Sequence, residues 1–179
     1  MKMLSQLRID GFRGIRDLEI DKLTQVNLIV GDNNCGKTSM LEAMQLLRSG
    51  SVANIYRVAK LRVNTFFTSS NSLYDNFICM FSKDANKLKI QLSGLYDGNE
   101  ISYILSGTES RELLDLNELD RVILRQFEEV KGETETDVFT GNSRYTINGR
   151  VSTEKIRLNR FSLMTGTSCL LYTSPSPRD

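Results

Sequence analysis

Short runs rich in apolar residues near the N-terminus predict strands. The first run covers residues 4–10 and the second covers residues 15–20, with the turn Gly11-Phe12-Arg13-Gly14 between them. Two short strands joined by a glycine-bounded turn predict an antiparallel pair. A third run, residues 26–30, is nearly all apolar, which is typical of a strand buried on both faces.

Apolar residues at three- and four-residue spacing predict helices further along the chain. The pattern indicates a helix over residues 38–48, a shorter one over residues 52–63 and a long amphipathic helix over residues 110–131. Residues 64–72 are polar and predict a loop. The acidic stretch of residues 128–137 predicts a second, solvated loop.

Two hairpins are predicted from alternating residues on either side of tight-turn dipeptides. Residues 88–92 and 101–105 alternate around Asp97-Gly98, and residues 145–151 contain Asn148-Gly149. Asp-Gly and Asn-Gly favour the turns that join antiparallel strands. The sequence therefore predicts both helices and antiparallel strands.

Composition narrows the class of protein. The 179 residues are 40% hydrophobic and 25% charged, with a net charge of +1, as expected for one soluble globular domain. No apolar run approaches the length of a membrane span, so we expect no membrane partner and a cytoplasmic location. Histidine is absent and the three cysteines lack metal-ligand spacing, which excludes a histidine-based triad and a structural zinc site.

The last residues follow a different composition. Both prolines of the chain, Pro175 and Pro177, fall within its final five positions. Residues 169–179 resemble a translated adapter or vector remnant, and the alternative is an ordinary disordered terminus. We expect the native sequence to stop near residue 168 and residues 169–179 to be a non-native or disordered tail.

The chemical signal is the segment Gly31-Asp32-Asn33-Asn34-Cys35-Gly36-Lys37-Thr38, which matches G-x-x-x-x-G-K-[ST] at every fixed position. Gly31 permits a sharp exit from the preceding strand, and Gly36 lets the backbone approach phosphates closely. Successive amides from about Asn33 to Thr38 form a concavity for phosphate oxygens, at the positive end of a helix.

The side chains of this motif predict a nucleotide with its metal ion. Lys37 supplies a positive charge to the β- and γ-phosphates. The Thr38 hydroxyl is suited to ligate Mg²⁺, which prefers hard oxygen ligands. Cys35 occupies a variable position; it is either incidental or a redox-sensitive thiol. The predicted cofactors are ATP and Mg²⁺.

The order strand, Gly11-Phe12-Arg13-Gly14, strand, phosphate loop and Thr38-Ser39-Met40-Leu41-Glu42-Ala43 resembles the opening of ABC-type ATPase heads. These include RecF, the SMC proteins and, most closely, the OLD family of AAA-type ATPases. The match is strong over residues 4–47. The resemblance implies an α/β P-loop NTPase fold, like an ABC-ATPase head with an antiparallel β-lobe.

The resemblance also assigns residues. It places Gly31, Asn33, Asn34, Cys35, Gly36, Lys37 and Thr38 at the phosphates, with Ser39 beside them. Arg13 matches a basic turn residue that often lies near the nucleotide in these heads, and the alternative is a solvated turn residue. Phe12 is expected to anchor the core rather than stack on adenine.

Hydrolysis needs a Walker B strand, an apolar run that ends in Asp and usually Glu. No such run is present, and Leu113-Leu114-Asp115 is too short. We therefore expect residues 1–168 to form the N-terminal part of an AAA/ABC-type ATPase domain, truncated before Walker B and inactive alone. The resemblance implies that the full-length parent hydrolyses ATP as a homodimer or higher oligomer. It also implies a parent fused to a Toprim nuclease, acting on DNA in repair or phage defence.

Two alternatives remain at this stage. The first is another P-loop NTPase, such as a small kinase or a GTPase, although the N-K-x-D guanine signature is absent. The second is a non-catalytic module that holds DNA phosphates. Its basic residues would be Arg144, Arg150, Lys155, Arg157 and Arg160.

Overall fold

A computed structural model describes residues 3–62, 71–82, 88–115 and 133–160. Its centre is a six-stranded antiparallel sheet in the order β2-β1-β3-β4-β5-β6. The strands are β1 (Leu4–Phe12), β2 (Ile15–Ile20), β3 (Leu88–Tyr96), β4 (Asn99–Asp115), β5 (Glu133–Ile147) and β6 (Arg150–Asn159).

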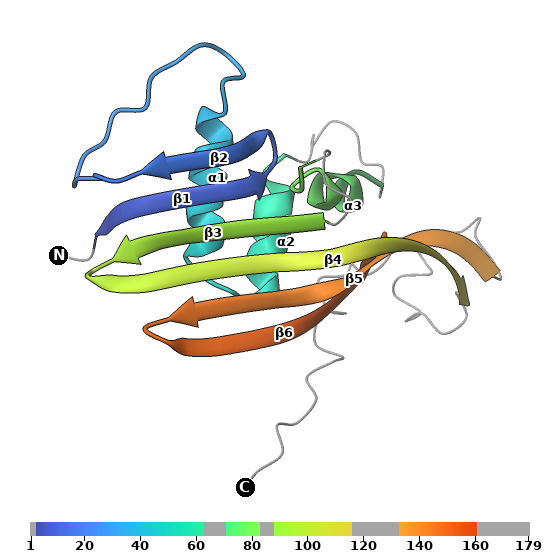
Figure 1. Ribbon diagram of the computed structural model, residues 1–179. Helices are drawn as coiled ribbons and strands as arrows, with labels where there is room; N and C mark the ends of the chain where they lie inside the picture. Colours follow the sequence, from blue (N-terminus) through green and yellow to red (C-terminus); the bar gives the residue numbers. More distant parts are fainter. Residues whose placement is uncertain (1–2, 63–70, 83–87, 116–132, 161–179) are drawn as a thin grey trace, which may run out of the picture.

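Among the described residues, three helices cover one face of the sheet and none covers the other face (Figure 1). They are α1 (Lys37–Leu47), α2 (Val52–Lys60) and α3 (Asn71–Ile78). Alternate residues of each strand point toward the helices, so Ile9 and Leu92, which are paired in register, are both fully buried. The core therefore lies between the sheet and the helices.

An aromatic cluster seals the core where β4 and β5 cross α3. The Phe139 ring lies 5.0 Å from the Phe77 ring and 5.4 Å from the Phe81 ring, centroid to centroid. A Cβ atom added to Gly107 would lie 2.5 Å from the Phe139 ring, and one added to Gly141 would lie 2.8 Å from it. Because both positions lack a side chain, the ring can lie directly over the backbone of the two strands.

The connection between α1 and α2 fixes α1 on the sheet. The buried Asn54 side chain donates to the carbonyl oxygens of Gln45 at 2.7 Å and Ser49 at 3.1 Å, so it satisfies acceptors at the end of α1. The Ser143 hydroxyl of β5 donates to the Gly50 carbonyl at 3.1 Å. These bonds hold the helix whose N-terminus closes the phosphate-loop motif.

Most elements of the N-terminal half and both hairpins are confirmed. β1 and β2 pair antiparallel, α1 and α2 occupy the expected segments, and Asp97-Gly98 and Asn148-Gly149 turn the chain between paired strands. Phe12 is fully buried, as expected of a core anchor. None of the described helices is long and apolar enough to cross a membrane.

The predicted helix over residues 110–131 is wrong for residues 110–115, which continue β4, and residues 116–132 lie outside the described part. The predicted acidic loop is likewise wrong for residues 133–137, which begin β5. Fifteen residues of β4 pair with β5, from Ile101 opposite Ile147 to Asp115 opposite Glu133. Pairing over such a length satisfies backbone groups regardless of the local helical pattern. Similarly, α3 begins at Asn71, inside the predicted loop, whose residues 64–70 are not described.

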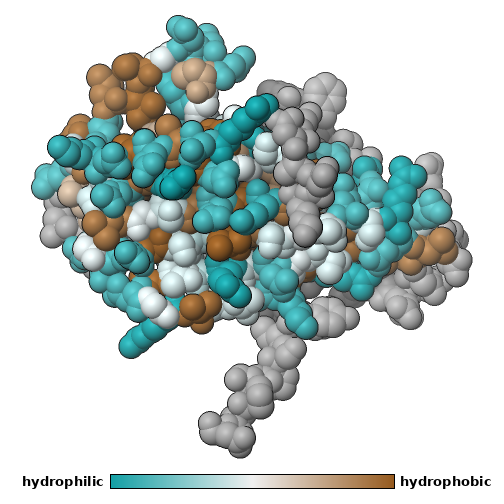
Figure 2. Space-filling model, in the orientation of Figure 1, coloured by the Kyte–Doolittle hydropathy of each residue, from teal (hydrophilic) through white to brown (hydrophobic). Residues whose placement is uncertain are grey.

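The predicted buried strand over residues 26–30 is also wrong. Residues 26–30 form no strand, and the side chains of Val26, Leu28 and Val30 are 87%, 87% and 76% exposed. Asn27 instead bonds locally, because its side chain accepts from the Thr24 amide at 2.9 Å and donates to the Thr24 carbonyl at 2.7 Å. A strand needs neighbouring strands for its backbone bonds, and none of the described strands lies beside this segment. Apolar atoms are accordingly visible at the upper left of Figure 2, where the segment leaves the body.

Candidate nucleotide-binding site

The phosphate-loop motif folds sharply at three positions before α1. Gly31, Asn34 and Gly36 have φ angles of 155°, 64° and 97°, in the region that favours glycine. A Cβ atom at Gly31 would lie 2.7 Å from the Cys35 sulfur, so a larger residue there would force the loop open. The two fixed glycines of the motif are therefore required by the shape of the loop itself.

The backbone amides of the loop are almost all free of protein acceptors. Within the described residues, Cys35 is the only one of residues 33–39 whose amide donates outside the helix, to the Asp32 carbonyl at 3.4 Å. Gly36 begins α1 as its N-cap without any side-chain cap. The first-turn amides of a helix lack intrahelical partners and carry a partial positive charge. The loop and helix start thus offer a set of donors suited to an anion.

Lys37 folds back over the loop from the first position of α1. Its ammonium donates to the carbonyl oxygens of Gly31 at 2.7 Å and Asp32 at 2.6 Å, and it lies 3.6 Å from the Cys35 sulfur. The two carbonyl groups are neutral, so they leave the positive charge uncompensated. The ammonium is therefore held at the loop, where phosphate oxygens would compete with two carbonyls.

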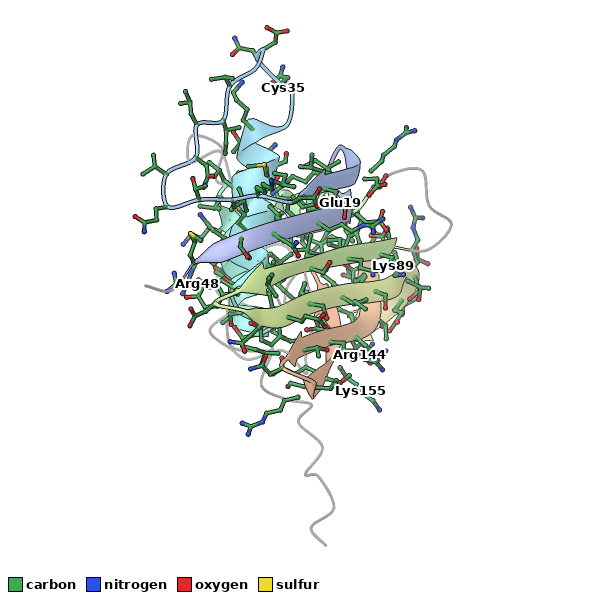
Figure 3. The ribbon with its side chains drawn as sticks, turned by 60° about the vertical axis from the view of Figure 1, so that its left-hand side comes forward. Glu19, Cys35, Arg48, Lys89, Arg144 and Lys155 are labelled. Atoms are coloured by element: carbon green, nitrogen blue, oxygen red, sulfur yellow. The ribbon has the colours of Figure 1, made fainter. Side chains whose placement is uncertain are left out.

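The loop forms one wall of a surface hollow of about 450 Å³. Residues lining it are Asn33, Asn34, Cys35, Gly36, Lys37, Thr38, Ser39 and Arg62. The structure thus brings together every predicted phosphate-loop residue except Gly31, whose carbonyl faces Lys37 instead. Figure 3 shows Cys35 on this loop, which projects beyond the edge of the sheet that β2 forms.

The residues of the hollow fit a nucleotide phosphate with Mg²⁺. Thr38 is exposed in the hollow, where its hydroxyl would serve as a hard oxygen ligand beside phosphate oxygens. Across the described residues, no group of three His, Cys, Asp or Glu side chains gathers to hold a metal ion. A metal ion here would depend on Thr38 and on the phosphates for its ligands.

Arg13 has a largely buried side chain and does not line the hollow. Its side chain is only 7% exposed, and its Nε lies 2.5 Å from an oxygen of Glu42, itself 4% exposed. Burial lowers the pKa of Arg13 below its ordinary value, although the Glu42 carboxylate opposes this change. The solvated-turn alternative is therefore wrong, and Arg13 reaches the phosphate loop only through α1.

Two residues of the site, Glu42 and Arg62, were missed by the sequence analysis. Arg62 follows α2 and pairs with Glu42 at 2.8 Å, so the carboxylate lies between two arginines. Glu42 did carry a signal, because it is a charged residue among the mostly apolar buried positions of α1, which include Ala43 and Leu46. Arg62 carried no such signal in the sequence. Only the packing of α2 against α1 brings it near the phosphate loop, which lies more than twenty residues earlier in the chain.

The comparison with protein families decides between classes of phosphate-binding loop. A family model described as an AAA ATPase domain matches residues 1–174. The chain belongs to this AAA ATPase domain family. Membership agrees with the loop, the following helix and the glycine turn from which an ATP-binding ATPase was predicted.

Curated relatives resemble parts of this AAA ATPase chain. An uncharacterized protein of Methanocaldococcus jannaschii, MJECL10, is 32% identical over 52% of the chain and 42% of its own length. An ATP/GTP phosphatase of Helicobacter pylori is 30% identical over 55% of the chain and 26% of its own length. The DNA replication and repair protein RecF of a Marinomonas species is 30% identical over 64% of the chain and 30% of its own length. The chain thus spans between about a quarter and two fifths of these relatives.

Proposed function

We propose that this AAA ATPase domain binds ATP with Mg²⁺ through residues 31–39. The observation that carries the proposal is the set of free amides at the start of α1, together with a lysine whose partners are two neutral carbonyls. Anions bind such helix starts because the aligned amide donors and the helix dipole favour negative charge. Lys37 adds the full positive charge that a triphosphate needs.

Titration calorimetry with Mg-ATP and Mg-GTP tests the binding site. Lys37→Ala should abolish measurable binding, because it removes the ammonium while leaving the fold intact. Lys60→Ala is the matched control, since Lys60 is an exposed lysine at the end of α2 and does not line the hollow. Equal ATP affinity of Lys37→Ala and the parent chain would contradict the site assignment. Preference for GTP would favour a different nucleotide class.

We further propose that the protein to which this domain belongs is an OLD-like or RecF-like ATPase. Support comes from the RecF relatives and from the turn and loop motifs over residues 4–47. In such an enzyme, hydrolysis requires residues supplied opposite the loop by a second subunit, so it would act as a homodimer or higher oligomer. ATP turnover should accordingly rise more steeply than linearly with protein concentration. A strictly linear dependence would argue against this assembly.

DNA is the proposed partner, and one feature of the open sheet face favours it. Lys89, Arg144 and Lys155 lie at the lower right of the sheet in Figure 3. Their register places all three on the face opposite the helices, and none has a carboxylate partner among the described residues. Arg157 and Arg160, also predicted as DNA contacts, instead pair with Glu112 and Asp137. Arg150 is exposed beside the hairpin turn.

Filter binding to duplex DNA at two salt concentrations tests the DNA proposal. Replacing Lys89, Arg144 and Lys155 together by alanine should weaken binding and flatten its salt dependence, because each phosphate contact contributes about 0.9 to the slope. A triple alanine variant of Lys22, Arg57 and Lys60 loses the same charge elsewhere on the surface and should bind normally. Equal losses in both variants would indicate an effect of net charge alone.

A further inference from the structure

Of the described residues that line the hollow, Arg62 alone does not come from the phosphate loop or the start of α1. It is held there by two contacts. Its Nε donates to Glu42 at 2.8 Å, and its Nη2 donates to the Ser39 hydroxyl at 3.2 Å. The side chain remains 39% exposed. The guanidinium is thus fixed in place while part of it faces the hollow.

The guanidinium has donors left for a ligand. Arginine carries five N–H groups, of which Glu42 and Ser39 take one each. No other described residue accepts a hydrogen bond from Arg62. Because the planar guanidinium presents its donors in a fixed arrangement, those that remain suit the paired oxygens of a phosphate.

The charge balance of the cluster also favours an anion. Glu42 lies between Arg13 and Arg62, so one carboxylate faces two guanidinium groups. Arg13 is nearly buried and needs the carboxylate to offset its desolvation, whereas Arg62 is partly solvated. One positive charge is therefore left over at the edge of the hollow.

Ser39 links this cluster to the loop. Its oxygen accepts from Arg62, so its own proton stays available to donate into the hollow. We propose that Arg62 is a second cationic phosphate ligand of this site, held in position by Glu42, and that Ser39 donates beside it. The inference rests on the proposed ATP binding and adds a residue from outside the motif to it.

Calorimetry with Mg-ATP and with tripolyphosphate, on the chain and on Arg62→Ala, Arg62→Lys and Arg57→Ala, tests the inference. Hydrogen bonds to charged groups contribute substantially to binding. Arg62→Ala should therefore lower the affinity for both ligands by roughly tenfold to a hundredfold. Arg62→Lys should recover part of the loss, because it keeps the charge without the fork. Arg57→Ala, an exposed arginine of α2 outside the hollow, should bind like the parent chain.

Each result separates this inference from the proposed function. Loss of binding in Lys37→Ala with unchanged binding in Arg62→Ala would overturn the role of Arg62 and leave the ATP site intact. A lower melting temperature of Arg62→Ala with unchanged affinity for both ligands at low temperature would assign Arg62 a structural role and overturn the inference. No binding by the parent chain would overturn both. Equal weakening of ATP and tripolyphosphate supports a phosphate contact, and weakening of ATP alone opposes it.

Discussion

Apolar residues are buried in the antiparallel sheet, whereas most of those in the segment that leads into the phosphate loop are exposed. In the sheet, Ile9, Leu92 and Tyr103 are fully buried under the helices, and every strand pairs with a neighbour. In residues 26–30, Val26 and Leu28 are each 87% exposed and no strand forms. The sheet supplies its own partners, whereas the segment leading into the phosphate loop lacks them among the described residues.

This contrast indicates that the phosphate loop is positioned mainly by α1, the helix that follows it. Residues 31–36 receive their shape from local backbone conformation and from α1, which is fixed by Asn54 and the Glu42 cluster. The preceding segment contacts the body through Leu23, which is buried, and Ile29, which is partly buried, while Val26, Leu28 and Val30 stay exposed. Changes in the sheet should therefore act on folding, and changes at the exposed positions Val26, Leu28 and Val30 should leave folding almost unchanged.

The largest effect is expected in the aromatic cluster. Phe139→Ala should lower the free energy of unfolding by about 3–5 kcal/mol, because it leaves a cavity against Phe77 and Phe81. Urea unfolding followed by circular dichroism measures the change. A loss below about 1 kcal/mol would mean that the sheet does not carry the stability that its packing indicates.

A smaller loss is expected where the sheet meets the site. Glu42→Ala leaves the buried Arg13 charge without its carboxylate and should cost about 3 kcal/mol. Glu19→Ala, an exposed glutamate of β2, is the control and should change stability by less than about 0.5 kcal/mol. Similar melting curves for the two variants would show that the ion cluster does not join α1 to the turn.

Alkaline pH should destabilise the fold through two buried tyrosines, Tyr103 on β4 and Tyr74 on α3. Burial raises the pKa of Tyr103, and of Tyr74, above the ordinary value of 10. The folded chain keeps these protons while the unfolded chain loses them above pH 10, so stability is complete below pH 10 and falls above it. The fall is about 1.4 kcal/mol per pH unit for each tyrosine. Urea unfolding at pH 8 and 10.5 should show a smaller fall for Tyr103→Phe.

The smallest effect is expected before the loop. Leu28→Ser replaces an 87% exposed side chain and should change the free energy of unfolding by less than about 0.5 kcal/mol. Thermal unfolding of the variant and the parent chain measures the difference. A loss comparable to that of Phe139→Ala would refute the contrast, because it would place Leu28 in a packed environment in solution.

Features governed by local sequence could be predicted, and features governed by distant pairing could not. The motif glycines permit the observed backbone conformations, and Asp-Gly and Asn-Gly favour hairpin turns, so α1 and both hairpins were expected correctly. Residues 110–115 carry part of a helical pattern but join β4 because β5 pairs with them. Conversely, residues 26–30 have the composition of a buried strand without a neighbour among the described strands. Arg62 entered the site only through the packing of α2.

The hydrogen bonds of Lys37 to Gly31 and Asp32 carry a consequence for nucleotide affinity. Binding of a phosphate is an exchange reaction, in which the ammonium gives up two dipolar partners to gain an ionic one. The measured affinity therefore reports the difference between two sets of contacts rather than the strength of the new set. A substitution that weakens the hydrogen bonds between Lys37 and those carbonyls would raise the affinity for the nucleotide, even though the substituted residue does not contact the nucleotide.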